Sequence, residues 1–130
     1  MRPPENVKLI ESTLSTLWFE EDGIFCSVFH ENALLTKESL QDSFNKILEL
    51  TKGEKVCWLG EVTHVPGVDR ETRDFASKET PKLIKALAIV TRSPISSMIA
   101  NLYLGLKKPP FPAKLFTDEQ KAREWLRHYL

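Results

Sequence analysis

The residue types that bind metals are scattered along this chain. The three histidines, His30, His64 and His128, show neither H-x-x-x-H nor E-x-x-H spacing, and the two cysteines add no ligand motif to them. Zinc sites and metalloprotease motifs place their ligands at such short, regular spacings. We therefore predict no metal site and no cofactor.

Candidate nucleophiles and acid–base groups are no better supported. Ser96 and Ser97 lack a G-x-S-x-G frame, and the five glycines of the chain are dispersed rather than gathered in a phosphate-binding loop. Asp69, Glu71 and Asp74 stand in the first turns of a predicted helix, where the positive end of the helix dipole favours acidic side chains. A structural role explains these acids, and we predict that the protein is not an enzyme.

The segment 93–106 is the most apolar part of the chain. Ser93 and Pro94 are typical of the start of a helix, and no charged residue follows them up to Leu106. A helix with apolar side chains on nearly every side is either buried on several faces or covered by something else. One interpretation is a core helix whose remaining surface forms a homodimer interface. Another is a helix that makes a peripheral contact with a membrane.

The elements that must position these residues alternate between strands and helices. We predict strands at 16–20, 24–29, 56–62, 86–92 and 113–116, and helices at 36–51, from 69 onward with a break at 80–81, at 94–106 and from 117 onward. Asp22-Gly23 predicts a hairpin turn between the first two strands, and Thr117-x-x-Gln120 resembles a helix capping box. This order predicts an α/β fold, with a mixed, mostly parallel sheet of four to five strands covered by about four helices.

The composition narrows the range of partners. With 18 basic and 18 acidic residues the net charge is zero, which argues against nucleic acid as a partner and favours self-association, so we expect a homodimer. No apolar run reaches the ~18–20 residues that span a bilayer. We predict one domain over residues 1–130, with residues 1–6 as a disordered tail.

Both cysteines lie in apolar segments that read as strands. Cys26 and Cys57 are therefore predicted to be reduced thiols of the core. The first residues of the chain lack the apolar stretch of a signal peptide. Together these features predict a cytoplasmic protein.

The order of elements and three segments carry a family resemblance. Those segments are residues 114–126 (KLFTDEQKAREWL), 71–76 (ETRDFA) and 102–109 (LYLGLKKP). From about Thr16 onward the chain resembles the bacterial STAS/CRAL-TRIO-like proteins, small relatives of the anti-sigma-factor antagonists, as an uncharacterised branch of that group. The resemblance implies a STAS-like domain and, as its function, a regulatory or protein-interaction module.

The antagonists carry an Asp-Ser-Ser-Gly signature with a phosphorylated serine near a helix N-terminus. The corresponding residues here are Asp69, Arg70, Glu71 and Thr72, so the aspartate matches but Glu71 occupies the acceptor position. The resemblance therefore does not extend to the phosphorylation switch. By analogy, Asp69, Arg70, Glu71 and Arg73 form an edge that docks a regulatory protein partner, and the alternative is a solvated helix face.

The CRAL-TRIO-like relatives imply a second function for the apolar helix. In those relatives a mobile apolar helix gates a pocket of lipid size. Applied to this chain, the likeness implies a small apolar-ligand binding protein whose pocket is gated by helix 94–106. The pocket-lining residues are then Ile95, Met98, Ile99, Leu102 and Leu106.

Overall fold

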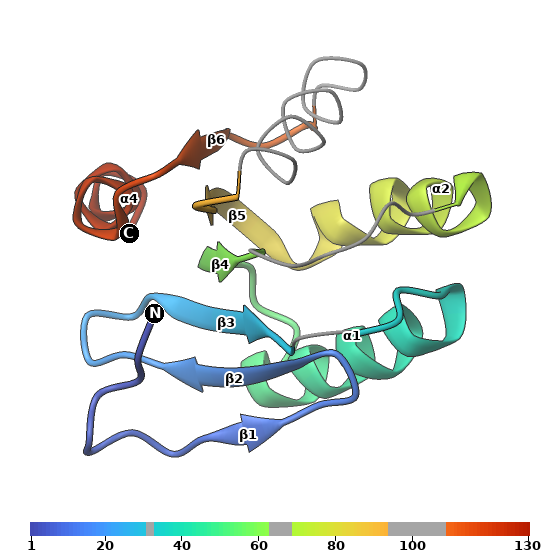
Figure 1. The fold of residues 1–130 in the computed structure, drawn as a ribbon, viewed down its shortest axis with the longest axis horizontal. Coiled ribbons are helices and arrows are strands. Elements are labelled where there is room, and N and C mark those ends of the chain that lie inside the picture. Colours follow the sequence, from blue (N-terminus) through green and yellow to red (C-terminus); the bar gives the residue numbers. More distant parts are fainter. Residues whose placement is uncertain (31–32, 63–68, 94–108) are drawn as a thin grey trace.

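In a computed structural model, the chain forms a six-stranded sheet with helices on both faces (Figure 1). The structure describes residues 1–30, 33–62, 69–93 and 109–130. The strands are β1 (Ile10–Glu11), β2 (Ser15–Phe19), β3 (Phe25–Phe29), β4 (Val56–Glu61), β5 (Ile84–Val90) and β6 (Ala113–Phe116). The helices are α1 (Lys37–Thr51), α2 (Arg70–Glu79), the short 3-10 helix η1 (Thr80–Lys82) and α4 (Glu119–Arg127).

The strands lie in the sheet in their chain order. β1, β2 and β3 pair antiparallel, and β3 to β6 pair parallel. At the hairpin between β2 and β3, Asp22 accepts a hydrogen bond from the Ile24 amide and Gly23 adopts a φ of 93°, a conformation that glycine allows. The predicted mixed α/β sheet with an N-terminal antiparallel hairpin is confirmed. Its additional strand is β1, which is only two residues long.

The alternation of side chains along the strands divides the core between two faces. On one face, Trp18 and Leu59 pack with Ala122 and Leu126 of α4. On the other face, Leu17 and Phe25 lie in a cluster with apolar residues of α1. Figure 1 shows α4 on one side of the sheet and both α1 and α2 on the other.

The helix starts follow the local sequence, with one correction. Thr36 caps α1 through a capping box with Ser39, and Asp69 caps α2. The last helix is capped by Asp118 and not by Thr117, because the Asp118 carboxylate accepts hydrogen bonds from the amides of Gln120 and Lys121. A carboxylate at this position also interacts favourably with the helix dipole.

The sequence also predicts the state of the two cysteines and the order of the N-terminal residues. Cys26 and Cys57 are both free and buried, as predicted. For residues 1–6 the sequence predicts a disordered tail. In the structure Met1 packs against the core, with its ammonium 3.0 Å from both carboxylate oxygens of Glu61, so an apolar contact and an ion pair hold this end of the chain.

Candidate functional site

A cavity of about 250 Å³ lies between the sheet and helices α1 and α2. Strands β3, β4 and β5 form its floor, with Phe29, Trp58, Leu87 and Ile89 among the lining side chains. Phe29 is the last residue of β3, and Ile89 is next to the last residue of β5. The cavity therefore extends to the carboxyl ends of parallel strands, which is where open α/β sheets bind their ligands.

The two helices supply the opposite wall of the cavity. Leu40 and Phe44 of α1 and Ala76 of α2 line it. Phe44 stacks on Phe75 of α2, with ring centroids 6.0 Å apart and 13° between the ring planes, which joins the two helices beside the cavity. These residues form the apolar faces of two amphipathic helices, and those faces pack toward the sheet.

A hydrogen-bonded pair of side chains lies in the cavity floor. The indole Nε1 of Trp58 donates to the hydroxyl of Ser27 over 2.7 Å, and Trp58 also meets Phe25 edge to face. Gly60 pairs with Ser27 across the two strands, and a Cβ on Gly60 would lie 3.3 Å from the Ser27 Oγ. The glycine therefore leaves the space in which this pair forms.

Only one charged side chain lines the cavity within the described part of the chain. It is Arg73 of α2, an exposed residue. The two threonines that line the cavity already make hydrogen bonds to nearby residues of the chain. Thr72 is hydrogen-bonded to Asp69 at the start of α2, and the Thr80 hydroxyl donates to the carbonyl of Ala76. The cavity is thus apolar with a single cation at its wall.

The four residues predicted to dock a partner take different roles in the structure. Asp69 caps α2, and hydrogen bonds from the amide and the hydroxyl of Thr72 hold the pKa of its carboxyl below the usual value. Arg70 is 89% exposed and lies 4.0 Å from Asp74, while Glu71 lies 3.9 Å from Lys37 of α1. Arg73 lines the cavity, a position that the docking prediction did not include.

Five residues were predicted to line and gate a pocket. Ile95, Met98, Ile99, Leu102 and Leu106 lie outside the described residues. The gating of a pocket by residues 94–106 therefore stays a prediction.

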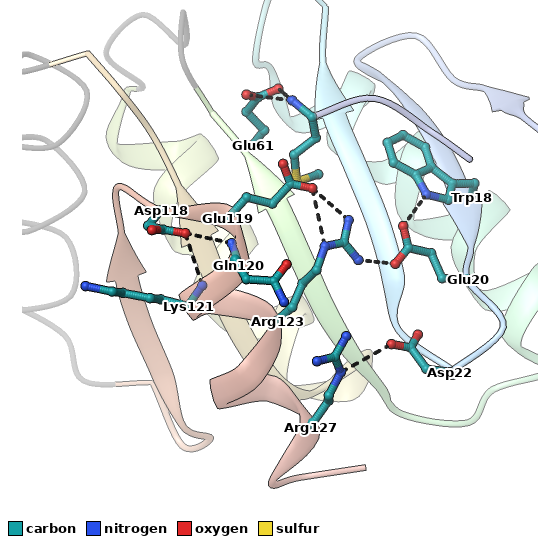
Figure 2. Close-up of polar contacts among 11 residues, drawn as sticks. Trp18, Glu20, Asp22, Glu61, Asp118, Glu119, Gln120, Lys121, Arg123 and Arg127 are labelled. Carbon is teal, nitrogen blue, oxygen red and sulfur yellow. Dashed lines mark hydrogen bonds and ion pairs between the residues drawn. The ribbon is translucent and has the colours of Figure 1, made fainter. Parts of the chain in front are cut away.

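A second polar cluster lies on the opposite face of the sheet (Figure 2). Arg123 of α4 donates to Glu20, which follows β2, and to Glu119 one turn earlier. Burial disfavours the charged guanidinium, but the hydrogen bonds to the two glutamates outweigh this effect and raise the pKa of Arg123. The indole of Trp18 donates to the other oxygen of Glu20 over 3.2 Å, so the cluster fastens α4 to the hairpin.

This cluster also affects a neighbouring thiol. Burial, together with the nearby charge of Glu20, raises the pKa of Cys26 well above its ordinary value. A thiol in that state is protonated and a poor nucleophile. The Glu119–Arg123 spacing of four residues is visible in the sequence, but the pairing with Glu20 is not.

Residues 1–30, 33–62, 69–93 and 109–130 contain no group of three His, Cys, Asp or Glu side chains placed to hold a metal ion. Across the same ranges, no helix combines the length and the apolar character that crossing a bilayer requires.

Comparisons with known proteins agree with this fold. A family model described as "Domain of unknown function (DUF7793)" matches residues 17–130. A crystal structure of an uncharacterized protein of the DUF3478 family from Shewanella loihica PV-4, which has a SpoIIAA-like fold, covers 92% of this chain and 91% of its own. The two share 16% sequence identity at a TM-score of 0.52, which establishes the SpoIIAA-like (STAS) fold predicted from the sequence.

The other comparisons add no functional information. A protein of unknown function from Arthrobacter sp. FB24 is 22% identical over 85% of this chain and 96% of its own, at a TM-score of 0.30. No curated protein matches the chain.

Proposed function

Since the chain belongs to the family described as a domain of unknown function (DUF7793), we propose its function from its own geometry. It is a non-enzymatic module that binds a small apolar molecule between the sheet and helices α1 and α2. The observation that carries the proposal is the cavity of about 250 Å³.

The size and the lining of the cavity both suit such a ligand. An apolar cavity of about 150 Å³ is large enough to bind benzene, so a cavity of about 250 Å³ has room for a substituted ring or a short alkyl chain. Aromatic and aliphatic side chains such as Phe44, Trp58 and Leu87 line it. Transfer of an apolar molecule from water to this surface is favourable by about 25 cal/mol for each Å² buried.

The polar groups of the floor are consistent with an apolar occupant. The Trp58 indole is bonded to Ser27 and does not require a ligand acceptor. A ligand therefore contacts the faces of the aromatic rings, and the hydrogen bond keeps the Trp58 ring in one orientation. This pre-organisation lowers the entropic cost of binding.

A protein-interaction module is the second candidate function. The observation that favours it is the exposure of the start of α2, where Arg70 is 89% exposed and its ion pair with Asp74 is long, at 4.0 Å. Arg70 and Glu71 would then contact a regulatory protein. The two functions are compatible, because a ligand held beside α2 can change the position of this helix.

The ligand-binding proposal is tested with small apolar probes. We expect 1-octanol and n-butylbenzene to shift the indole N–H resonance of Trp58 in a titration followed by NMR. Ala76→Phe fills part of the cavity and should weaken binding at least about tenfold, whereas Lys78→Phe, at an exposed position of the same helix that is not among the cavity residues, should not. Equal binding by wild type and Ala76→Phe would contradict the proposal, as would a Trp58 resonance that no probe shifts.

A second measurement searches for the natural ligand. Native mass spectrometry of freshly purified protein, followed by organic extraction, should find a co-purifying apolar molecule. We expect its occupancy to be lower in Ala76→Phe than in Lys78→Phe.

A further inference from the structure

We infer that the ligand is an apolar carboxylic acid, whose carboxylate binds Arg73 at the wall of the cavity while its chain or ring fills the interior. This inference rests on the proposed function and deepens it. Three observations carry it: the position of Arg73, the absence of a described acidic oxygen within 4.0 Å of it, and the lack of any carboxylate in the described cavity wall.

Arg73 is placed to meet a charged group at the edge of an apolar space. It is exposed, so its guanidinium is hydrated in the absence of a ligand and carries no burial cost. The same residue lines the cavity. A molecule that enters with its apolar part first therefore leaves its polar end beside Arg73.

The charged neighbours of Arg73 leave its guanidinium available. Within the described residues no acidic oxygen lies within 4.0 Å of it, whereas Arg70 and Lys82 each have an acid at 4.0 Å or less. Asp69, whose carboxylate interacts electrostatically with Arg73, caps α2 by accepting hydrogen bonds from Thr72. Arg73 can therefore bind an additional carboxylate without breaking an existing ion pair.

The rest of the cavity wall favours an acid over other ligands with the same chain. No aspartate or glutamate lines the cavity in the described ranges, so a carboxylate bound there meets no like charge in the cavity wall itself. The Thr80 hydroxyl donates to the Ala76 carbonyl, and Thr72 is bonded to Asp69. Arg73 is thus the group that recognises the head of the ligand, and arginine matches the planar geometry of a carboxylate with two parallel hydrogen bonds.

The test compares two molecules with the same chain and different heads. Octanoate and 1-octanol are titrated into the intact chain, and binding is followed through the Trp58 indole resonance. We expect octanoate to bind about tenfold more tightly than 1-octanol, as a charge-assisted hydrogen bond adds that factor. Raising the salt concentration should reduce this preference and leave the affinity for 1-octanol unchanged.

Substitutions assign the preference to one residue. Arg73→Met should lower the affinity for octanoate to that for 1-octanol, and Arg73→Lys should retain part of the preference. Arg70→Met is the matched control, because Arg70 lies on the same helix and is not among the cavity residues. We expect it to bind both probes like the wild type, and thermal melting of each variant checks that it folds.

The outcomes separate the inference from the proposed function. Equal binding of the two probes, or a preference for octanoate that survives Arg73→Met, overturns the inference and leaves apolar-ligand binding intact. If neither probe shifts the Trp58 resonance, the proposed function fails and the inference fails with it.

Discussion

Trp58 of β4 donates its indole N–H to the hydroxyl of Ser27 on the neighbouring parallel strand β3, over 2.7 Å. Both residues line the cavity, and Gly60 lies beside them without a side chain. Three residues on two adjacent strands therefore shape one part of the cavity floor. Their contribution to stability can be measured independently of any ligand.

Ser27→Ala should destabilise the protein by about 1–3 kcal/mol. Ser27 is 1% exposed, and its replacement leaves the indole N–H of the half-buried Trp58 without its acceptor. Urea denaturation measures the change. Ser27→Ala combined with Trp58→Phe should cost less than the sum of the two single changes, and strict additivity would show that the bond contributes nothing.

Gly60→Ala should also destabilise the protein, by about 1–3 kcal/mol, because the added Cβ would lie 3.3 Å from the Ser27 Oγ and 3.6 Å from the Trp58 Nε1. The same substitution in a Ser27→Ala background should cost less, since one of the crowded atoms is then absent. Unfolding free energies of the two single variants and the double variant test this. A Gly60→Ala cost that is the same in both backgrounds would contradict the crowding explanation.

Arg123→Met should destabilise the protein by about 2 kcal/mol, a value between those of an exposed and a fully buried ion pair. The change leaves Glu20, whose side chain is 11% exposed, without its cation. Lys121→Met, at an exposed position of the same helix, is the control and should change stability by less than about 0.5 kcal/mol. Hydrogen exchange should locate the loss in α4, and equal protection of α4 in both variants would refute the anchoring role.

Asp69 should make stability depend on pH in the acidic range. Hydrogen bonds from Thr72 lower the pKa of Asp69 in the folded protein, so the unfolded chain binds this proton first as the pH falls. The stabilisation is therefore complete above the ordinary pKa of an aspartate and is lost as the pH falls through the lower, folded value. Asp69→Asn should be less stable than wild type at pH 7, and the two denaturation curves should converge at low pH. A constant difference across the acidic range would contradict this.

Cys26 and Cys57 should resist alkylation in the folded protein. Burial raises the pKa of both thiols, so almost no thiolate is present at neutral pH. Mass spectrometry after iodoacetamide treatment should show no adduct under native conditions and two adducts in urea. Rapid native modification of Cys26 would mean that the face covered by α4 opens easily.

Elements that depend on neighbouring residues were predictable from the sequence. The helix from Thr36 to Thr51 follows from a cap and an apolar stripe, and the hairpin follows from Asp22-Gly23. The N-cap of the last helix shows the limit of such reasoning, because the sequence predicts Thr117 and the structure has Asp118. Both side chains can accept the bonds, and the path of the chain out of β6 decides between them.

The candidate site could not be derived in this way. Ser27, Trp58 and Arg73 come from three separate elements, and Arg123 and Glu20 are 103 positions apart in the chain. The sequence by itself determined strands β2 to β6, helices α1, α2 and α4 and the α/β class, because local hydrogen bonds and apolar periodicity depend on neighbouring residues. Only the tertiary structure decided where the cavity lies and that Arg73 reaches it, because a cavity depends on how closely remote helices pack against the sheet.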